Sequence, residues 1–453
     1  MKILHTSDWH LGQLFYGKSR EREQSAFLHW LVEQVAQQDI DVVLVAGDLF
    51  DTGTPPSYAR SLYNHFIVQL QQTCPNCQLI LLAGNHDSVA VLNESKGLLK
   101  ALNTRVIAGA NPERLAEWIA ENAPKNSDEK SPRIIDAPSE ASFLLEPLEA
   151  VIPLNNKAGD VEAVLCAVPF LRPSDLMRSR AELSADDRQR QLQQQISEYY
   201  QNLYQAAQIL YPNKPVVMTG HLTTVGASSS ESVRDIYIGT LEAFPAAAFP
   251  PADYIALGHI HRPQKVAKTE HIRYCGSPYP LSFDEISREK QVLVVTLDAD
   301  RFIQAEPLSV PIFQPLARIN GDLDEIKRQL DQLVLIDQQK IGKEQTVWVE
   351  MSITTQDYLS DLQRRIDDMI ADRPIEVLRL RRQKTQRQSL ADQVPKVQLD
   401  ELSPEEVFQR RLSLETLTPE RAEALTACFN QVLSSQELEQ NPLTSTITPE
   451  AKS

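Results

Sequence analysis

The chain has 453 residues with a formal net charge of −16, and 42% of its residues are hydrophobic and 23% charged. These values are typical of a globular protein with a substantial core, and the acidity argues against a protein that holds nucleic acid over its whole surface. The sequence has no apolar run near the roughly 20 residues that span a bilayer, and its start, MKILHTSD, lacks a signal-peptide core. We therefore expect a cytoplasmic protein without membrane contact.

Short apolar runs recur through the first half of the chain, at residues 2–7, 41–47, 78–83, 162–168, 215–220 and 254–258. Most are apolar throughout rather than alternating, which predicts strands that are buried on both faces. Helical periodicity falls between them at residues 21–38, 57–72 and 183–210. This alternation of strands and helices predicts an α/β fold with layered sheets.

The second half has a different organisation. Residues 309–387 have the pattern strand, helix, strand, helix, strand, with helices expected at 323–333 and 358–370. This pattern predicts a small α+β domain. Two further helices are expected at 404–412 and 419–433, because a Ser or Thr that can act as N-cap, followed by Pro, precedes each of them. They have little core of their own, so we expect them to dock on this chain or another.

Five of the expected strands end in side chains that can bind metal ions. The strand ends contain the strings DWH, GDLFD, GNHD, GH and GHIH, and their candidate ligands are Asp8, His10, Asp48, Asn85, His221, His259 and His261. Ligand sites form at the carboxyl ends of strands in open α/β sheets, and glycine permits close backbone approach. On an extended chain, residues i and i+2 project to one side, so Asp8 and His10 are expected to face one point.

The chemistry of this set points to two cations. Carboxylate, amide and imidazole groups without thiolate suit manganese, iron or catalytic zinc better than structural zinc. Seven ligands exceed the needs of one ion, and they suit two ions about 3.5–4 Å apart that share a carboxylate and activate water toward a phosphodiester. A histidine outside such a set is usually structural, and we interpret His5, His29, His65 and His271 in that way.

Taken together, the five blocks resemble the signature of the calcineurin-like metallophosphoesterases, over about residues 1–262. The strings TSDWHLG, LVAGDLFD and YCGSPYPLSFDE are similar to one branch, the SbcD family of nuclease subunits, and this similarity covers most of the chain. It implies a layered α-β-β-α metallophosphoesterase sandwich at residues 1–285 and a small α+β capping domain at 286–390. It also implies C-terminal helices at 391–435 that dock an ATPase partner, and a disordered tail at 436–453.

The resemblance also implies a role for each matching residue. One metal would take Asp8, His10, Asp48 and His261, and the other would take Asp48, Asn85, His221 and His259. His86 would be a catalytic, non-ligand histidine that stabilises the scissile phosphate and protonates the leaving oxygen. Asp51 would orient His86. The implied cofactor is a pair of divalent ions, with manganese as the metal.

The resemblance implies DNA as the substrate. It also implies two activities, 3′–5′ exonuclease on double strands and endonuclease on single strands and hairpins, in repair, replication and recombination. The implied partner is an SbcC-type ATPase that couples ATP to cleavage, in a heterotetramer containing a homodimer of this chain. Two alternatives stay open: a general metallophosphodiesterase or phosphatase for small substrates, and a non-catalytic scaffold. The complete ligand set disfavours the scaffold.

Three segments are candidates for contacts with substrate or partner. The basic run RLRRQKTQR at residues 379–387 fits either a solvated strand end or a phosphate or partner contact. The segment GASSSESVR at 226–234 follows His221, and we hypothesise that it borders the substrate groove. The expected helices at 404–412 and 419–433 are the candidates for docking the ATPase.

Overall fold

The computed structural model describes residues 1–123, 148–176, 184–228, 233, 243–298, 301–340, 346–354, 359–383, 425–427 and 429. The chain divides into two units, Met1–Lys384 and Thr385–Ser453. The four described residues of the second unit are helical. The expected helix at 404–412, most of that at 419–433, the basic residues 384–387 and the tail at 436–453 lie outside the described residues. No described helix is long and apolar enough to cross a membrane.

Two six-stranded sheets form the first part of the larger unit. The first sheet has the order β14 (Phe302–Ser309), β13 (Gln291–Leu297), β1 (Lys2–Thr6), β4 (Val42–Val45), β5 (Gln78–Leu82), β6 (Thr104–Ile107). The second has the order β11 (Gln264–Lys265), β12 (Ile272–Tyr274), β10 (Tyr254–Gly258), β9 (Val216–His221), β8 (Val161–Cys166), β7 (Val151–Asn155). The central strands of each sheet run parallel, and the antiparallel pairings lie toward the edges.

The continuous apolar character of the strands follows from burial on both faces. In β4, Val42 and Leu44 belong to the core between the two sheets, whereas Val43 and Val45 belong to the core beneath the helices. Because successive side chains of a strand point to opposite faces, a strand covered on both sides needs apolar residues at every position. All six expected strands are present, and this part of the prediction is confirmed.

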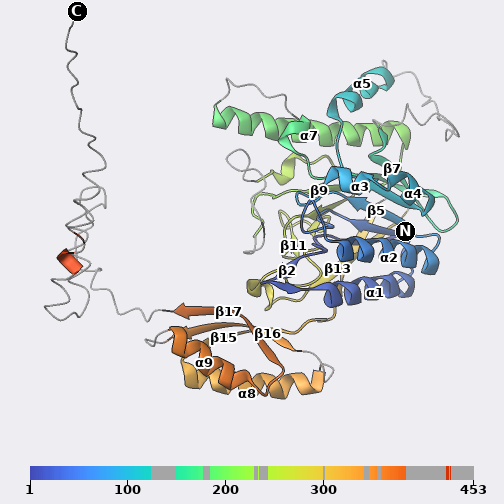
Figure 1. Cartoon of the computed structure of the whole chain (residues 1–453). Helices are drawn as coiled ribbons and strands as arrows, with labels where there is room; N and C mark the ends of the chain where they lie inside the picture. The colour runs from blue at the N-terminus through green and yellow to red at the C-terminus, as the bar shows by residue number, and fades with distance from the viewer. Residues whose placement is uncertain are drawn as a thin grey trace, which may run out of the picture. The chain divides into compact units, whose positions relative to one another are not determined.

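Helices cover the outer face of each sheet (Figure 1). On one side, α1 (Glu21–Gln37) and α2 (Ser57–Thr73) pack on the first sheet through residues such as Phe27 and Phe66. On the other, α5 (Pro112–Asn122) and α7 (Ala185–Leu210) pack on the second sheet, with Ile196 and Leu203 in the shared core. The layers are therefore α-β-β-α, as the family resemblance implied. Short elements complete this part: β2 (Leu14–Phe15), β3 (Lys18–Ser19), α3 (Val89–Asn93), α4 (Lys96–Ala101), α6 (Pro173–Leu176), η2 (Ala246–Ala248) and η3 (Phe283–Glu285).

A smaller parallel sheet follows, with the order β15 (Leu316–Gly321), β16 (Val347–Thr354), β17 (Ile375–Gln383). Its connections are α8 (Leu323–Lys340) and α9 (Leu359–Ile370), which share an apolar core with the sheet. This confirms the strand and helix order expected for the small domain.

The small domain was expected to start at residue 286, but the strand pairing places its first strand later in the chain. Strand β13 pairs with β1 and β14 pairs with β13, so residues 291–309 extend the first sheet. Alternate residues of β13 again enter two cores, Val292 on the helix side and Leu293 between the sheets. The capping sheet itself begins only at Leu316.

Candidate metal centre

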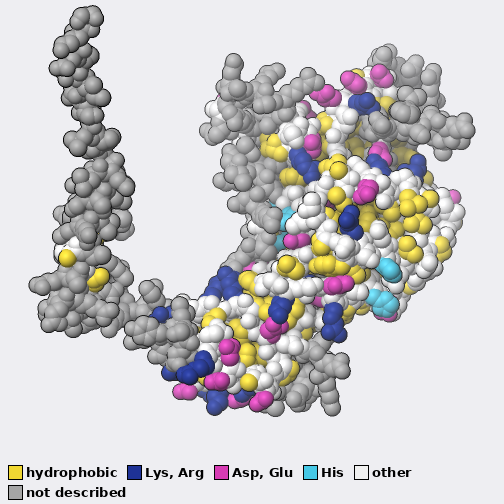
Figure 2. Space-filling model, in the orientation of Figure 1, with side chains coloured by type: hydrophobic (Ala, Val, Ile, Leu, Met, Phe, Trp, Pro, Cys, Tyr) yellow, Lys and Arg dark blue, Asp and Glu magenta, His cyan; other side chains and the backbone are white. Residues whose placement is uncertain are grey.

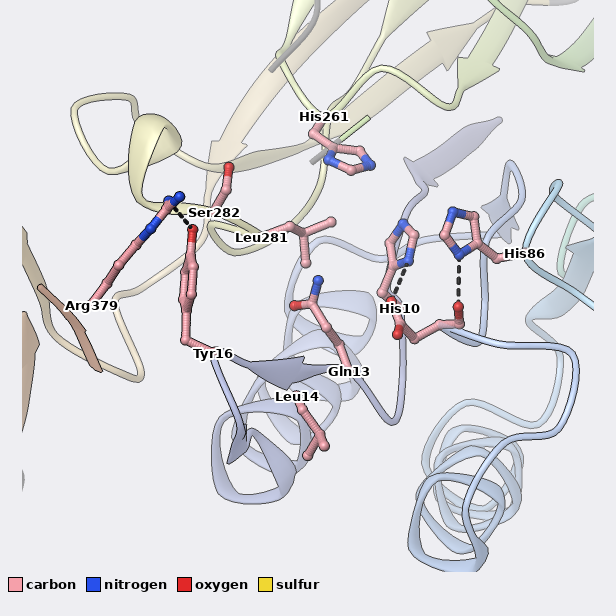
Figure 3. Close-up of a pocket in the computed structure, with 10 residues that line it drawn as sticks. His10, Gln13, Leu14, Tyr16, His86, His261, Leu281, Ser282 and Arg379 are labelled. Carbon is pink, nitrogen blue, oxygen red and sulfur yellow. Dashed lines mark hydrogen bonds and ion pairs between the residues drawn. The ribbon is translucent and has the colours of Figure 1, made fainter. Parts of the chain in front are cut away.

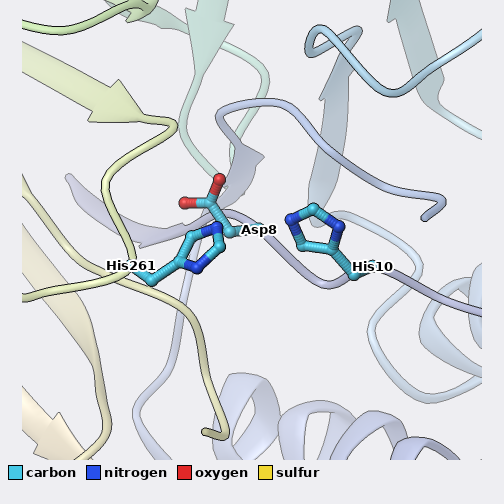
Figure 4. Close-up of side chains that lie close together, drawn as sticks. All are labelled: Asp8, His10 and His261. Atoms are coloured by element: carbon cyan, nitrogen blue, oxygen red, sulfur yellow. The ribbon is translucent and has the colours of Figure 1, made fainter. Parts of the chain in front are cut away.

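The predicted ligands come together where strand ends of the two sheets meet. The ligand atoms of Asp8, His10 and His261 lie within 4.8 Å of one another, and so do those of Asp48, His221 and His259. Figure 4 shows the first group, with the carboxylate of Asp8 next to the imidazole ring of His261 and the ring of His10 to the right in this view. We call these the Asp8 group and the Asp48 group. All six of these side chains are buried.

Asp48 links its own group to the Asp8 group. Its Oδ2 atom is 3.5 Å from Nε2 of His10 and 3.2 Å from Nε2 of His221. Its Oδ1 atom accepts a hydrogen bond of 2.9 Å from the backbone N–H of His86. Asn85 belongs with the Asp48 group, because its Oδ1 atom lies 3.0 Å from Nε2 of His221. The structure thus brings all seven predicted ligands into one cluster.

The backbone reaches this arrangement by a route that the sequence analysis did not expect. Asp8 and His10 are not part of an extended strand: β1 ends at Thr6, and the two residues have φ angles of 55° and 45°. Asp48 (φ 52°) and His259 (φ 90°) are also left-handed. Such angles are uncommon outside glycine and gather at functional sites. Asp8 and His10 converge because the turn folds back on the GDLFD loop, where their N–H groups bond to the carbonyl oxygens of Gly47 and Asp48, each at 3.0 Å.

Two glycines are required by close approach. A Cβ atom on Gly84 would lie 2.1 Å from Oδ1 of Asp48. A Cβ atom on Gly258 would lie 2.0 Å from the carbonyl oxygen of Ala46. A non-glycine residue at either position would displace a ligand or the backbone that holds it, which explains the glycines before these ligand blocks.

The residues present fit divalent cations. The donor set consists of carboxylate, amide and imidazole groups, which suit such ions. Each of three imidazoles directs Nδ1 to a second group: His221 to the carbonyl oxygen of Ala46 at 2.9 Å, His10 to Asp51 at 3.2 Å and His261 to Glu285 at 3.3 Å. Such contacts fix the ring and leave Nε2 for a metal. Nε2 of His10 is buried and has no hydrogen-bond partner within the described part of the chain. The site binds divalent metal.

The close packing of buried carboxylates and imidazoles shifts their pKa values. Burial alone would lower the pKa of His221, but the carboxylate of Asp48 outweighs it and raises the pKa to about 9. Burial disfavours the charged form of Asp48, yet His221 and His10 hold its pKa well below the ordinary value. Burial, together with repulsion from His221, lowers the pKa of His259 well below its ordinary value. Without a metal ion, the positive charge of an imidazolium therefore balances the buried carboxylates. A bound cation can supply that positive charge instead.

His86 lies beside His10 (Figure 3), and Asp51 lines the same pocket as these two histidines. Nδ1 of His86 is 2.7 Å from the backbone carbonyl oxygen of Asp51, while the carboxylate of Asp51 lies near His10. The hydrogen bond between His86 and Asp51 thus uses the main chain of Asp51, while the carboxylate oxygen lies within 4.8 Å of ring nitrogens of both His10 and His86. His10, His86 and His261 also line a pocket of about 380 Å³, which extends to Tyr16 and Arg379 at its other end.

Two further acidic residues support the centre. The carboxylate of Asp87 accepts hydrogen bonds from the N–H groups of Leu49, Phe50 and Gly84 at 3.1, 2.9 and 2.8 Å, which ties the GDLFD and GNHD loops together. Burial, and then repulsion from Asp48, raises the pKa of Asp87 to about 6. Glu285 contacts His261. The sequence analysis gave neither a role, although Asp87 lies inside the GNHD block and Glu285 ends YCGSPYPLSFDE.

The remaining histidines have other surroundings. His5 is buried, with Nδ1 3.0 Å from the hydroxyl of Tyr254. His29 and His65 are exposed on α1 and α2, and Figure 2 shows histidine side chains on the surface over these helices. The groups of side chains that could hold a metal ion among the described residues include none of these three, nor His271.

The candidate contact segments are described in part. Arg379 and Arg381 each form an ion pair of 3.2 Å with Glu350, and Nη1 of Arg379 donates to the hydroxyl of Tyr16 at 3.1 Å. Ser228, near the start of the segment after His221, accepts a hydrogen bond of 2.8 Å from Arg262. This places the described start of that segment beside the residue that follows His261. Residues 229–232, 234 and 384–387 lie outside the described residues.

One motif in the sequence does not form the structure it usually signals. Residues 12–19, GQLFYGKS, fit the pattern of a phosphate-binding P-loop, G-x-x-x-x-G-K-[ST]. A P-loop wraps its backbone around a phosphate between a strand and a helix. Here the residues form the two-stranded β2–β3 hairpin, and Lys18 makes an ion pair with Glu376. The match therefore gives no nucleotide site.

Comparison with known proteins agrees with this geometry. Residues 1–263 match the calcineurin-like phosphoesterase family, and residues 312–416 match the SbcD_C family, described as the type 5 capsule protein repressor C-terminal domain. The SbcD subunit of the SbcCD nuclease from Escherichia coli K12 is 47% identical over 435 residues, 96% of this chain and 98% of the relative.

More distant relatives carry the same name. The SbcD subunit of the SbcCD nuclease from Rhodobacter capsulatus is 32% identical, over 74% of this chain and 77% of its own length. The protein of that name from Bacillus subtilis is 28% identical, over 80% and 81%. Together with the metal centre, these similarities show that the chain belongs to the SbcD family of nuclease subunits within the calcineurin-like phosphoesterases.

Proposed function

We propose that this chain hydrolyses DNA phosphodiester bonds at a site for two divalent cations, with manganese as the metal. The observation that carries the proposal is the position of Asp48 Oδ2 between His10 and His221, one imidazole from each group. A carboxylate shared in this way is the element that a two-metal phosphoesterase needs. Family membership supports the nuclease activity, and the all-nitrogen and oxygen donor set supports manganese.

Each ligand has a defined place in this proposal. Asp8, His10 and His261 would hold one cation, Asn85, His221 and His259 would hold the other, and Asp48 would contribute to both sites. A bound pair of cations would supply Lewis-acid polarisation of the phosphodiester and activation of a water molecule as the nucleophile. The chain itself contributes the buried, fixed geometry that holds these ligands in place.

His86 is proposed to act on the leaving group. Because Nδ1 donates to the carbonyl of Asp51, a second proton on this ring resides on Nε2. His86 lines the pocket beside the metal ligands, so a protonated Nε2 is placed to stabilise the scissile phosphate and to protonate the departing oxygen. Asp51 positions His86 through its main chain and His10 through its carboxylate.

The proposed biological unit includes an ATPase. The relatives are named as the SbcD component of an SbcCD nuclease, and by analogy the partner here is an SbcC-type ATPase. Residues 286–390 would include the capping domain, and the C-terminal helices expected within 391–435 would dock the ATPase. We also propose a homodimer of this chain within a heterotetramer. The specificity proposed from the resemblance is 3′–5′ exonuclease action on double strands and endonuclease action on single strands and hairpins, in DNA repair, replication and recombination.

The test compares a labelled hairpin DNA with a small ester, bis-p-nitrophenyl phosphate, in manganese. Each is incubated with the chain alone and with an SbcC-type ATPase and ATP, with Asp48→Ala as the matched inactive variant. Hairpin cleavage that rises with the ATPase and is lost in Asp48→Ala is the expected result. Turnover of the ester with the DNA left intact, even with the partner present, would favour a small-substrate phosphodiesterase instead.

A further inference from the structure

We propose that Glu285 is a positioning residue for His261 and strengthens cation binding at the Asp8 group. The inference rests on the metal site of the proposed function and assigns a role to a residue outside the seven predicted ligands. Glu285 and His261 are both buried, and Oε1 of Glu285 lies 3.3 Å from Nδ1 of His261. A carboxylate at this distance holds the ring as the Nδ1–H tautomer and turns Nε2 toward the cation.

The carboxylate of Glu285 is itself held rigidly. Its Oε2 atom accepts a hydrogen bond of 2.5 Å from Nζ of Lys290 and another of 3.1 Å from the N–H of Leu281. The hydroxyl of Ser277 also donates to Oε2, at 3.3 Å. With one oxygen fixed by these donors, the other has a fixed direction toward His261, as a ligand-orienting group requires.

The same cluster fixes the main chain of His261. Its carbonyl oxygen accepts from the N–H of Ser277 at 3.2 Å and from Nζ of Lys290 at 3.3 Å. Gly276 allows this approach, since it has φ +80° and a Cβ atom there would lie 2.8 Å from that oxygen. His261 is therefore held at its ring and at its backbone by one short segment, the SPYPLSFDE stretch and Lys290 after it.

The support given to His261 differs from that given to the Asp48 group. Nδ1 of His221 faces a neutral carbonyl oxygen, that of Ala46, whereas Nδ1 of His261 faces a carboxylate. A carboxylate behind the ring makes the opposite nitrogen a stronger donor to a metal. Removing the charge of Glu285 should therefore weaken one cation site and leave the other nearly unchanged.

The competing explanation is that Glu285 only neutralises the buried ammonium of Lys290. Glu285→Gln alone would leave that ammonium unpaired, which destabilises a protein whatever else the residue does. The double variant Glu285→Gln with Lys290→Met removes the pair together. Glu289→Gln is the matched control, because Glu289 undergoes the same chemical change at an exposed position four residues away.

The experiment titrates Mn²⁺ into each metal-free full-length chain by calorimetry and records thermal unfolding without metal. We expect both Glu285 variants to lose about 10- to 100-fold in affinity for one Mn²⁺, with the second Mn²⁺ and the Glu289→Gln control unchanged. A lower unfolding temperature with unchanged Mn²⁺ affinity in both variants would overturn the inference and leave the metal site standing. Failure of the unsubstituted chain to bind Mn²⁺ would overturn the proposed function as well.

Discussion

Nδ1 of His86 lies 2.7 Å from the main-chain carbonyl oxygen of Asp51. The carboxylate of Asp51 lies 3.2 Å from Nδ1 of His10, and one of its oxygens is also within 4.8 Å of a ring nitrogen of His86. Asp51 thus contacts His86 through its main chain and His10 through its carboxylate, and a change of its side chain alters only the second of these contacts directly.

Asp51→Asn removes the carboxylate charge beside His10 and keeps the main-chain carbonyl that bonds to His86. We expect Mn²⁺ affinity to fall by about 10-fold, because the ring of His10 loses the carboxylate that holds it. Calorimetry measures this affinity, and cleavage rates at saturating Mn²⁺ report any further effect of the same charge on His86, whose ring nitrogen lies within 4.8 Å of that carboxylate. Unchanged Mn²⁺ affinity would show that the carboxylate does not support the metal site through His10.

His86→Ala tests protonation of the leaving oxygen. The deoxyribose oxygen of DNA leaves poorly without a proton, whereas p-nitrophenolate leaves readily. We expect DNA cleavage to fall by about 10²- to 10⁴-fold, with a clearly smaller loss for bis-p-nitrophenyl phosphate and with unchanged metal content. Equal losses on both substrates would exclude general-acid action by His86 and assign it to binding of the phosphate alone.

Gly84→Ala tests how tightly the bridging carboxylate is packed. The new Cβ atom would lie 2.1 Å from Oδ1 of Asp48, so Asp48 must move. A shift of about 1 Å at such a group lowers activity by about 100-fold. Gly53→Ala is the control, because its Cβ atom would meet its nearest neighbour, on Ser88, at 3.7 Å. Comparable kcat values for the two variants would show that the loop absorbs the added methyl group.

His5 predicts a loss of stability in acid that is independent of the metal. Burial lowers its pKa from 6.5 to about 3, so below pH 6.5 the unfolded chain takes up a proton that the folded chain refuses. Stability therefore falls as the pH is lowered from 7 to 5, by about 2 kcal/mol for this one group. In urea unfolding of the metal-free chain, the free energy of unfolding of His5→Asn should fall by about 2 kcal/mol less between pH 7 and pH 5 than that of the unsubstituted chain. An identical change in both proteins would refute a buried neutral His5.

Much of this architecture could be predicted from the sequence, because burial leaves a pattern in it. The strand at Val42–Val45 is apolar at every position since both of its faces are covered. That the candidate ligands would lie together could be predicted because imidazoles and carboxylates recur at successive strand ends. Strand β13 has the same uniform apolar character, yet its pairing with β1 joins residues nearly 300 positions apart, which no local pattern reveals.

The details that hold the site were harder to predict for a physical reason. The contact from His86 to Asp51 uses a main-chain oxygen, which every residue carries, so residue type gives no signal. The convergence of Asp8 and His10 depends on left-handed φ angles that aspartate and histidine adopt only in a suitable tertiary setting. Glu285 reaches His261 across 24 positions of chain that include the strands β11 and β12, so the contact follows from the tertiary fold and not from a local pattern.

The central claim is that two cations sharing Asp48 cut DNA. The most direct test titrates Mn²⁺ into the metal-free chain and measures, at each point, the number of ions bound and the rate of DNA cleavage. The account predicts two Mn²⁺ per chain, with cleavage appearing as the second ion binds, and loss of both ion binding and cleavage in Asp48→Ala. Full cleavage with a single ion bound, or two bound ions and no cleavage of DNA, would contradict it.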